Sequence, residues 1–401
     1  MSFNPQEVRF LCAQLDEIDR IATSGEIALT KKSAIADRTV VHKHFGEHSR
    51  AVMELLQARR VLAAKLDSTG WLADSDSAQQ ATPLAVARVR AARIAAAGAS
   101  LVHDVTCSIG TEAPAMTAAG MDWLGTDLDY SRLLMARHNI GRLESGRAWV
   151  AQADALAPVT TPASSSGPRI RACSGSGPGR VIVADPARRV DGRRITDPAK
   201  LIPPLPDLLA AYPGAAMAIK CAPGSDYSDW DGLVSVVSVD GGVKEACLYT
   251  PDLAEHQREA VVIRESFTEQ VVDDGGAVNV DKPKSFIIDP DGAIVRAGLV
   301  QQWAARHELT MLDPHIAYLS GEAIPEGYSG FPFIEAVPLK KLRPALQAHG
   351  AGALEILVRG VNVDPDQLRA KLKLKGDRPM SVVIARIGDA ASAFICDARV
   401  R

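Results

Sequence analysis

The sequence predicts an α/β protein: a parallel β-sheet covered by helices on both faces and finished by a β-hairpin, with a helical region before it and an α+β region after it. The first observation is that short apolar runs alternate with helical segments between residues 101 and 221. The second is a pair of strand-like runs around Asp240-Gly241-Gly242, a sequence typical of a hairpin turn. The third is the helical spacing of apolar residues up to about residue 75.

The composition is that of a globular protein. The chain has 401 residues, of which 47% are hydrophobic and 23% charged, which excludes a disordered or fibrous protein and allows two or three domains. The formal net charge of -3 argues against a protein that coats nucleic acid non-specifically, although it permits a local basic face. Aromatic residues make up 5%, which is few for a protein that stacks many bases.

The cysteine pattern excludes two kinds of site. The six cysteines are scattered without a CxxC pair, at Cys12, Cys107, Cys173, Cys221, Cys247 and Cys396. This excludes a disulfide framework and a cysteine-rich zinc site, and it is typical of a reducing cytoplasm. There is no signal-like N-terminus and no run of about 18 apolar residues, so we expect a cytoplasmic protein without a membrane span. His44 and His48 lie one helical turn apart, but no carboxylate completes a set, and we expect no metal.

Changes in pattern along the chain predict its organisation. We expect a helical N-terminal region over 1–79, an α/β domain over 80–256 with an exposed, flexible Pro/Gly/Ser-rich insertion over 157–180, and an α+β domain over 257–401. Thr82 is expected to be the N-cap of a helix that has Pro83 in its first turn.

The last third of the chain has an uneven charge distribution. Residues 256–329 contain 6 Lys/Arg against 12 Asp/Glu, whereas residues 330–401 contain 12 against 7. The final segment is therefore expected to present a basic face. Its stretch 369–378, RAKLKLKGDR, fits either a contact with a phosphate backbone or a solvated helix end whose lysines favour the helix dipole.

Several predicted strands end in an acidic residue where the chain enters a loop. Asp104 ends the first strand, Asp127 and Asp129 follow the second, and Asp154 follows the third. Ligands of open α/β sheets bind beyond the carboxyl ends of the strands. The small residues at 106–111 allow close approach to the loop backbone, and an acid about 20 residues later can accept the hydroxyls of a ribose.

The same loop excludes two classes of cofactor site. Positions 106–111 have the sequence TCSIGT, so the GxGxxG of a dinucleotide site is absent. A GxxxxGKS or GxxxxGKT loop for ATP is also absent. The pattern therefore favours a nucleoside cofactor without a pyrophosphate.

Four motifs in order resemble the series of class I S-adenosylmethionine-dependent methyltransferases: D-V-T-C-S-I-G-T, G-T-D-L-D, A-D and V-A-D-P-A-R-R. The first two are similar to those of the trimethylguanosine synthase group. The whole chain more closely resembles a bacterial group with a THUMP-like C-terminal domain, whose motifs match D-P-A-R-R at 185–189 and LKGDRPMSVVIAR at 374–386. The resemblance covers most of residues 80–401. Ser108 stands where many of these enzymes have glycine, so its backbone is expected to avoid positive φ.

The resemblance implies a Rossmann-like methyltransferase domain and a role for each motif. Asp104 and the loop residues Thr106, Cys107, Ser108 and Gly110 would hold the methionine end of S-adenosylmethionine. Asp127, with Asp129 beside it, would bind the ribose, and Asp154 the adenine. Asp185 and Pro186 would line the target pocket and hold an amine in line with the methyl group. The weaker candidates for substrate binding are Arg188, Arg189 and Lys220; Arg188 and Arg189 fit surface salt bridges equally well.

The favoured reaction is methylation of a base nitrogen in RNA, because THUMP domains of related enzymes present RNA to a methyltransferase. One alternative is C5 methylation of uridine with Cys221 as nucleophile. Cys221 in K-C-A-P-G lies where 5-methyluridine methyltransferases have their cysteine. A small buried strand residue fits the same pattern. Another is a non-catalytic RNA-binding or scaffold protein.

Overall fold

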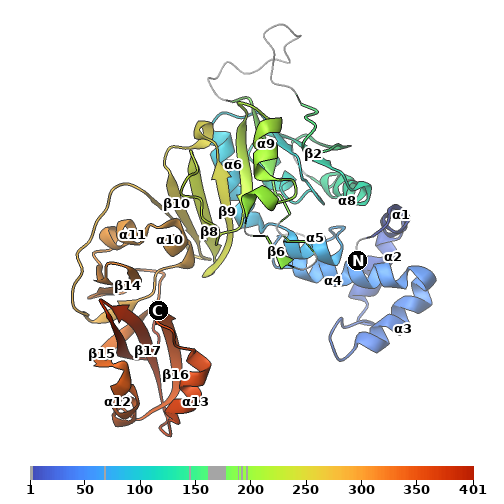
Figure 1. The fold of residues 1–401 in the computed structure, drawn as a ribbon. Coiled ribbons are helices and arrows are strands. Elements are labelled where there is room, and N and C mark those ends of the chain that lie inside the picture. Colours follow the sequence, from blue (N-terminus) through green and yellow to red (C-terminus); the bar gives the residue numbers. More distant parts are fainter. Residues whose placement is uncertain are drawn as a thin grey trace. The chain divides into compact units, whose positions relative to one another are not determined.

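A computed structural model describes the chain except residues 1–2, 67–68, 144–145, 161–177, 188, 191–192 and 196 (Figure 1). The chain forms two compact units, one made of residues 1–234 and 244–255, the other of residues 235–243 and 256–401. No helix in the described part of the chain is long and apolar enough to cross a membrane.

The N-terminal part of the first unit is helical, as its apolar spacing predicts. Its helices are α1 (Pro5–Ala13), α2 (Leu15–Thr23), α3 (Ala34–Phe45), α4 (Ser49–Ala63) and α5 (Ser75–Gln80). They share a core that also contains Ile109 and Met135 of the α/β part. The Asn139 amide strengthens this attachment, because it accepts from the Leu72 N–H at 2.8 Å and donates to the carbonyls of Leu72 at 3.0 Å and Ile109 at 2.9 Å.

The nine-stranded sheet of the α/β part has the order β11-β10-β8-β9-β7-β4-β1-β2-β3. Five strands pair in parallel: β1 (Leu101–Asp104), β2 (Asp122–Asp127), β3 (Ala148–Gln152), β4 (Arg180–Ala184) and β7 (Ala216–Cys221). The remaining strands are β8 (Leu233–Val239), β9 (Gly242–Tyr249), β10 (Arg258–Ile263) and β11 (Thr268–Val272). Two short strands, β5 (Arg189–Val190) and β6 (Arg193–Arg194), pair separately.

Helices cover both faces of this sheet, which confirms the predicted fold class. Side chains alternate between the faces along a strand. In β4, Val181 and Val183 pack in the core shared with α6 (Leu84–Ala96), α7 (Ala113–Ala118) and α8 (Tyr130–Ile140). Ile182 and Ala184 pack in the core shared with α9 (Leu205–Ala211).

The hairpin of β8 and β9 turns at Asp240 and Gly241, which have φ values of 49° and 80°. Two successive residues with positive φ are the signature of a type I′ turn, and the hairpin that the sequence predicts is confirmed. The start of α6 differs from the prediction. Pro83 is its N-cap, and the hydroxyl of Thr82 instead accepts a hydrogen bond from the buried Lys220 ammonium.

The second unit contains a seven-stranded sheet of order β13-β14-β12-β15-β18-β17-β16. Its strands are β12 (Phe286–Ile288), β13 (Thr310–Asp313), β14 (Ile316–Gly321), β15 (Gly330–Pro338), β16 (Ala351–Arg359), β17 (Arg378–Ile387) and β18 (Ala390–Asp397). Its helices are α10 (Gly292–Ala297), α11 (Val300–Arg306), α12 (Leu342–Ala348) and α13 (Pro365–Leu372). Because β16 and β17 run in parallel, α13 has to cross over between them.

Candidate active site

The loop after β1 takes a conformation that the sequence did not predict. Ser108 has a φ of 49° and Gly110 a φ of 80°, so the expectation that Ser108 avoids positive φ is wrong. In this conformation the Ser108 N–H donates to Asp127 Oδ2 at 3.0 Å. A charge-assisted hydrogen bond offsets the cost of about 1–2 kcal/mol for a non-glycine residue in the left-handed region.

The carboxylate of Asp127 is held from two sides at the end of β2. Besides Ser108, it accepts the Asp129 N–H on Oδ1 at 2.9 Å. Each carboxylate oxygen has two lone pairs, so both retain capacity for a further donor such as a hydroxyl. Asp127 is half-buried and open to such a ligand.

The other two acids beyond β2 and β3 have local structural roles. Asp129 is the N-cap of α8 and accepts from the N–H groups of Ser131 and Arg132 at 2.8 and 3.2 Å. Asp154 is exposed and accepts the Leu156 N–H at 2.9 Å, which closes a turn. Capping and turn formation alone account for these two contacts.

Asp104 is a buried carboxyl at the end of β1, with 3% of its surface exposed. Its Oδ1 accepts the Thr106 N–H at 3.2 Å, and it forms no ion pair with any residue that the structure describes. Burial raises the pKa of Asp104 to about 8, and the neighbouring negative charge of Glu112 contributes to the rise. A buried carboxyl that forms no ion pair in the described chain can accept the positively charged end of a ligand.

The loop after β1 is also connected to the end of β4. Thr106 Oγ1 accepts the Asp185 N–H at 2.6 Å, and Pro186 follows as a buried residue. Cys107 contributes its backbone, whose N–H donates to the Thr126 carbonyl at 3.0 Å. Its side chain is buried, and burial raises the pKa of the Cys107 thiol well above its usual value, so the thiol stays protonated.

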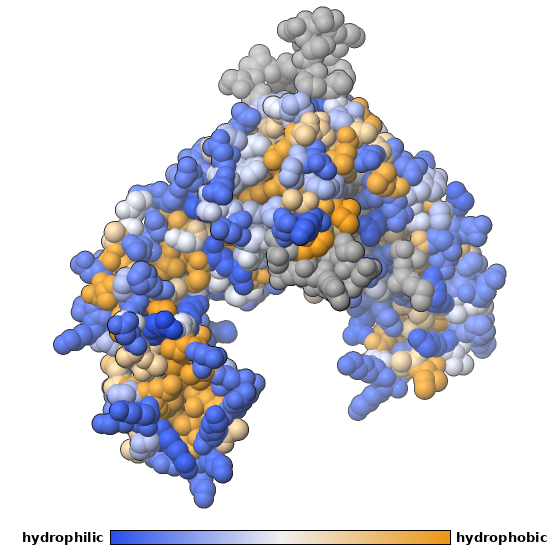
Figure 2. All heavy atoms as spheres, in the orientation of Figure 1, coloured by the Kyte–Doolittle hydropathy of each residue, from blue (hydrophilic) through white to orange (hydrophobic). Residues whose placement is uncertain are grey.

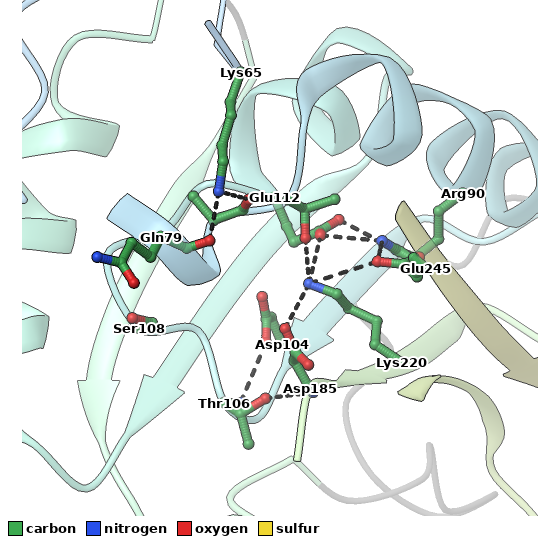
Figure 3. Close-up of polar contacts among 12 residues, drawn as sticks. Lys65, Gln79, Arg90, Asp104, Thr106, Ser108, Glu112, Asp185, Lys220 and Glu245 are labelled. Carbon is green, nitrogen blue, oxygen red and sulfur yellow. Dashed lines mark hydrogen bonds and ion pairs between the residues drawn. The ribbon is translucent and has the colours of Figure 1, made fainter. Parts of the chain in front are cut away.

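Asp185 belongs to a cluster of charges centred on Lys220 of β7, whose other members are buried (Figure 3). Lys220 Nζ lies 2.7 Å from Asp185 Oδ2, 3.3 Å from Glu112 Oε1 and 3.9 Å from Glu245 Oε2. Arg90 of α6 completes the cluster, with Nη2 at 3.2 Å from Glu112 and Nη1 at 2.5 Å from Glu245. We call Arg90, Glu112, Asp185, Lys220 and Glu245 the charge cluster.

Opposite charges outweigh the effect of burial on the pKa values of Glu112 and Lys220. Burial would raise the pKa of Glu112, yet Arg90 and Lys220 lower it to about 2. Burial would likewise lower the pKa of Lys220, but Asp185, Glu112 and Glu245 raise it above its ordinary value. The Lys220 ammonium is thus surrounded by the carboxylates of the charge cluster, and its role in substrate binding stays a prediction.

The N-terminal helical part supports the same region. Lys65 Nζ donates to the carbonyls of Ala78 at 2.9 Å, Gln79 at 2.5 Å and Ala81 at 3.0 Å (Figure 3). This holds in place the segment that leads to Thr82, the hydroxyl partner of Lys220.

Sequence reasoning did not identify Arg90, Glu112 or Glu245. One signal was available for Arg90, which lies among Val86, Ala87 and Ile94 on the buried face of α6. A charged residue on such a face needs a buried partner. Nothing in the local sequence indicates that Glu112 and Glu245 are those partners.

Comparisons with known proteins agree with this geometry. Two curated relatives from strains of Mycobacterium tuberculosis, both described as uncharacterized S-adenosylmethionine-dependent methyltransferases, are 41% identical over 373 residues, which is 88% of this chain and 98% of theirs. This chain belongs to the S-adenosylmethionine-dependent methyltransferases. The cofactor of this methyltransferase is therefore S-adenosylmethionine.

The structural comparison covers almost the whole methyltransferase, whereas the family model matches its C-terminal part. A crystal structure described as a "putative methyltransferase" from Porphyromonas gingivalis covers 99% of both chains with a TM-score of 0.67 and 17% identity, and thus has the same fold. Residues 329–398 match the family described as THUMP domain-like, which confirms a THUMP-like domain at the C-terminus.

Two predicted features of the methyltransferase lie wholly or partly outside the described residues. They are Arg188 with the side chain of Arg189, and most of the 157–180 insertion.

Proposed function

We propose that this methyltransferase methylates a base nitrogen in RNA, either tRNA or rRNA, and that Asp185 and Pro186 position the target. The position of Asp185 is the observation on which the proposal depends. Its N–H is bonded to the loop after β1 through Thr106, and its carboxylate is paired with Lys220. Support for RNA comes from the THUMP-like match at residues 329–398 and from the excess of basic residues there.

The cofactor site of the proposal uses the carboxyl edge of the sheet. Asp104 would pair with the amino group of the methionine end, while the backbone of Thr106, Cys107, Ser108 and Gly110 would line that end. Two fixed donors orient the Asp127 carboxylate, which would accept the ribose hydroxyls. Asp129 would lie beside the ribose, and Asp154 would bind the adenine. When bound, S-adenosylmethionine supplies a methyl group on a sulfonium, which an aligned nucleophile can accept.

Asp185 is suited to aligning an amine. Its Oδ2 is paired with Lys220, which leaves Oδ1 to accept a hydrogen bond from a target N–H. This contact directs the nitrogen lone pair at the methyl group, and the same oxygen can take up the proton that the nitrogen loses. Pro186 fixes the backbone direction after Asp185.

Replacing Asp185 by Asn is expected to lower methyl transfer by about 100-fold or more while S-adenosylmethionine affinity stays within about threefold. The amide keeps the shape but cannot accept a proton. Methyl incorporation into RNA from cells that lack the gene, together with calorimetric titration of the cofactor, measures both effects. Asp207→Asn, at an exposed position on α9, is the matched control and should leave both unchanged. Normal transfer by Asp185→Asn would contradict the proposed role.

Nucleoside mass spectrometry of tRNA and rRNA, with and without the gene, tests the reaction itself. Loss of an N-methylated base would support the proposal. Loss of a C5-methylated pyrimidine would replace it by the Cys221 reaction. Unchanged nucleosides would contradict RNA modification under those growth conditions.

Cys221 is fully buried in β7, with 0% of its surface exposed. A nucleophile has to reach its substrate, so we expect Cys221→Ala to keep methyl transfer within about threefold and to cost about 1 kcal/mol of stability from the lost packing. Activity assays at a temperature below the unfolding transition measure this. A folded but inactive Cys221→Ala protein would favour the C5 reaction instead.

A further inference from the structure

A basic hollow lies on the THUMP-like domain, where α12 ends and where the chain leaves α13. Its volume is about 510 Å³, and its lining residues are Arg343, Gln347, Gly350, Ala351, Lys373, Lys375 and Gly376. Three of these residues are cations and none is an acid. We call this set the basic hollow.

The floor of the basic hollow is formed by two backbone segments in direct contact. The Gly376 N–H donates to the Ala351 carbonyl at 3.1 Å, and the Arg378 N–H donates to the Gly350 carbonyl at 3.2 Å. A Cβ added to Gly376 would lie 1.9 Å from the Gly350 carbonyl oxygen, so only glycine permits this approach. The absence of side chains here leaves room above the floor.

The walls are formed by exposed cations that the fold directs outward. Lys373 ends α13 in the left-handed conformation, with a φ of 47°. Leu372 and Leu374 pack in the domain core, so Lys373 and Lys375 point to solvent. Arg343 comes from a different helix, α12, and is also exposed. On the face shown in Figure 2, hydrophilic side chains border an apolar area of this domain.

These three cations differ in their pairing from several other basic residues of the domain. Other basic residues of the domain do form ion pairs: Arg359 with Asp289, Arg369 with Asp366, Arg378 with Asp397 and Arg399 with Glu355. Within the described residues, Arg343, Lys373 and Lys375 pair with no carboxylate. Interaction with the dipole of α13 can explain the position of Lys373. It does not explain the other two cations, because Arg343 belongs to another helix and Lys375 lies beyond α13.

We propose that the basic hollow binds the phosphodiester backbone of the RNA substrate and anchors it to the THUMP-like domain. The inference rests on the proposed function. The volume suits a nucleotide better than a single phosphate, and phosphate contacts fix a nucleic acid in place without reading its sequence. Three cations that neutralise phosphates of single-stranded RNA contribute about 2 to the slope of log affinity against log salt concentration.

The test uses the full chain with Arg343→Gln, Lys373→Gln and Lys375→Gln combined. Its affinity for total tRNA, purified from cells that lack the gene, is measured over a range of salt concentrations. We expect a loss of about tenfold or more at physiological salt and a slope that is smaller by about 2. The matched control combines Lys340→Gln, Arg386→Gln and Arg401→Gln, which removes the same charge from exposed positions of the domain outside the hollow. It should retain most of the affinity.

The outcomes separate this inference from the proposed function. Unchanged RNA affinity and slope in the hollow variant, or an equal loss in the control variant, would contradict RNA binding by the basic hollow. Methyl transfer to RNA by the wild type would still support the proposed function. A wild-type protein that binds S-adenosylmethionine but no RNA would overturn both. Cofactor titration of the hollow variant should match the wild type and shows that the protein is folded.

Discussion

Replacing Lys220 by methionine is expected to destabilise the protein by about 3–5 kcal/mol and to abolish methyl transfer. Lys220 is 5% exposed and forms an ion pair with Asp185, and its ammonium also lies close to Glu112 and Glu245. Without it, Asp185 loses its ion pair, and Glu112 and Glu245 share the single charge of Arg90. Removing one partner of a buried ion pair is costly because the remaining charges are left without compensation. A loss of this size is a large fraction of the stability of an ordinary domain.

If Asp185 holds the target as proposed, Lys220 would act through it as a positioning residue, so activity and stability have to be measured separately. Denaturant unfolding gives the loss of stability, and activity is assayed at a temperature where the variant is still folded. The double variant Lys220→Met with Glu112→Gln should recover about 1–3 kcal/mol, because it removes one of the stranded charges.

An exposed lysine provides the control for this prediction. Lys200, whose side chain is 76% exposed, pairs with Asp197 at 3.5 Å, and Lys200→Met should change stability by less than about 0.5 kcal/mol. If Lys220→Met unfolded at the same denaturant concentration as the wild type, the charge cluster would have no structural importance.

Replacing Asp104 by Asn is expected to stabilise the cofactor-free protein at neutral pH and to weaken S-adenosylmethionine binding by about 100-fold. The pKa of Asp104 is about 8 in the folded protein, whereas an unfolded aspartate titrates near 3.9. Between these values the folded state holds a proton that the unfolded state lacks, so the wild type loses stability as pH rises from about 4 to 8. Asn cannot ionise, so the variant does not lose this stability, and its free energy of unfolding should be roughly 2–5 kcal/mol higher than that of the wild type at pH 8.

The same titration predicts how cofactor binding depends on pH. An Asp104 carboxylate pairs with a cationic amino group, whereas the protonated acid does not, so affinity of the wild type should rise between pH 6 and 8 and binding should release a proton. Calorimetry in buffers of different ionisation enthalpy counts that proton. The control is Asp122→Asn, at the end of β2 opposite Asp127, which should bind S-adenosylmethionine with wild-type affinity. If Asp104→Asn bound S-adenosylmethionine with wild-type affinity, Asp104 would not be a cofactor-binding residue.

Local sequence signals determined much of the fold. The apolar runs that end in Asp104 and Asp127 are strands β1 and β2, with these acids as their last residues. Asp240-Gly241 forms the hairpin turn because both residues tolerate positive φ. Such features depend on neighbouring residues, and the motif series that follows them identified the methyltransferase. The sequence could therefore place the loop backbone and Asp185 at one edge of a sheet.

Only the tertiary structure decided which charges meet beneath that edge. Strands β4 and β7 are neighbours, with Ala184 paired to Ile219, so the next residues, Asp185 and Lys220, come to the same height. Glu112, Glu245 and Arg90 join them from other elements, and no short-range pattern encodes that meeting. The positive φ of Ser108 likewise depends on a distant partner, Asp127. The sequence by itself determined elements and motifs, since these arise from adjacent residues, whereas buried ion pairs depend on strand order and helix packing, which only the folded chain specifies.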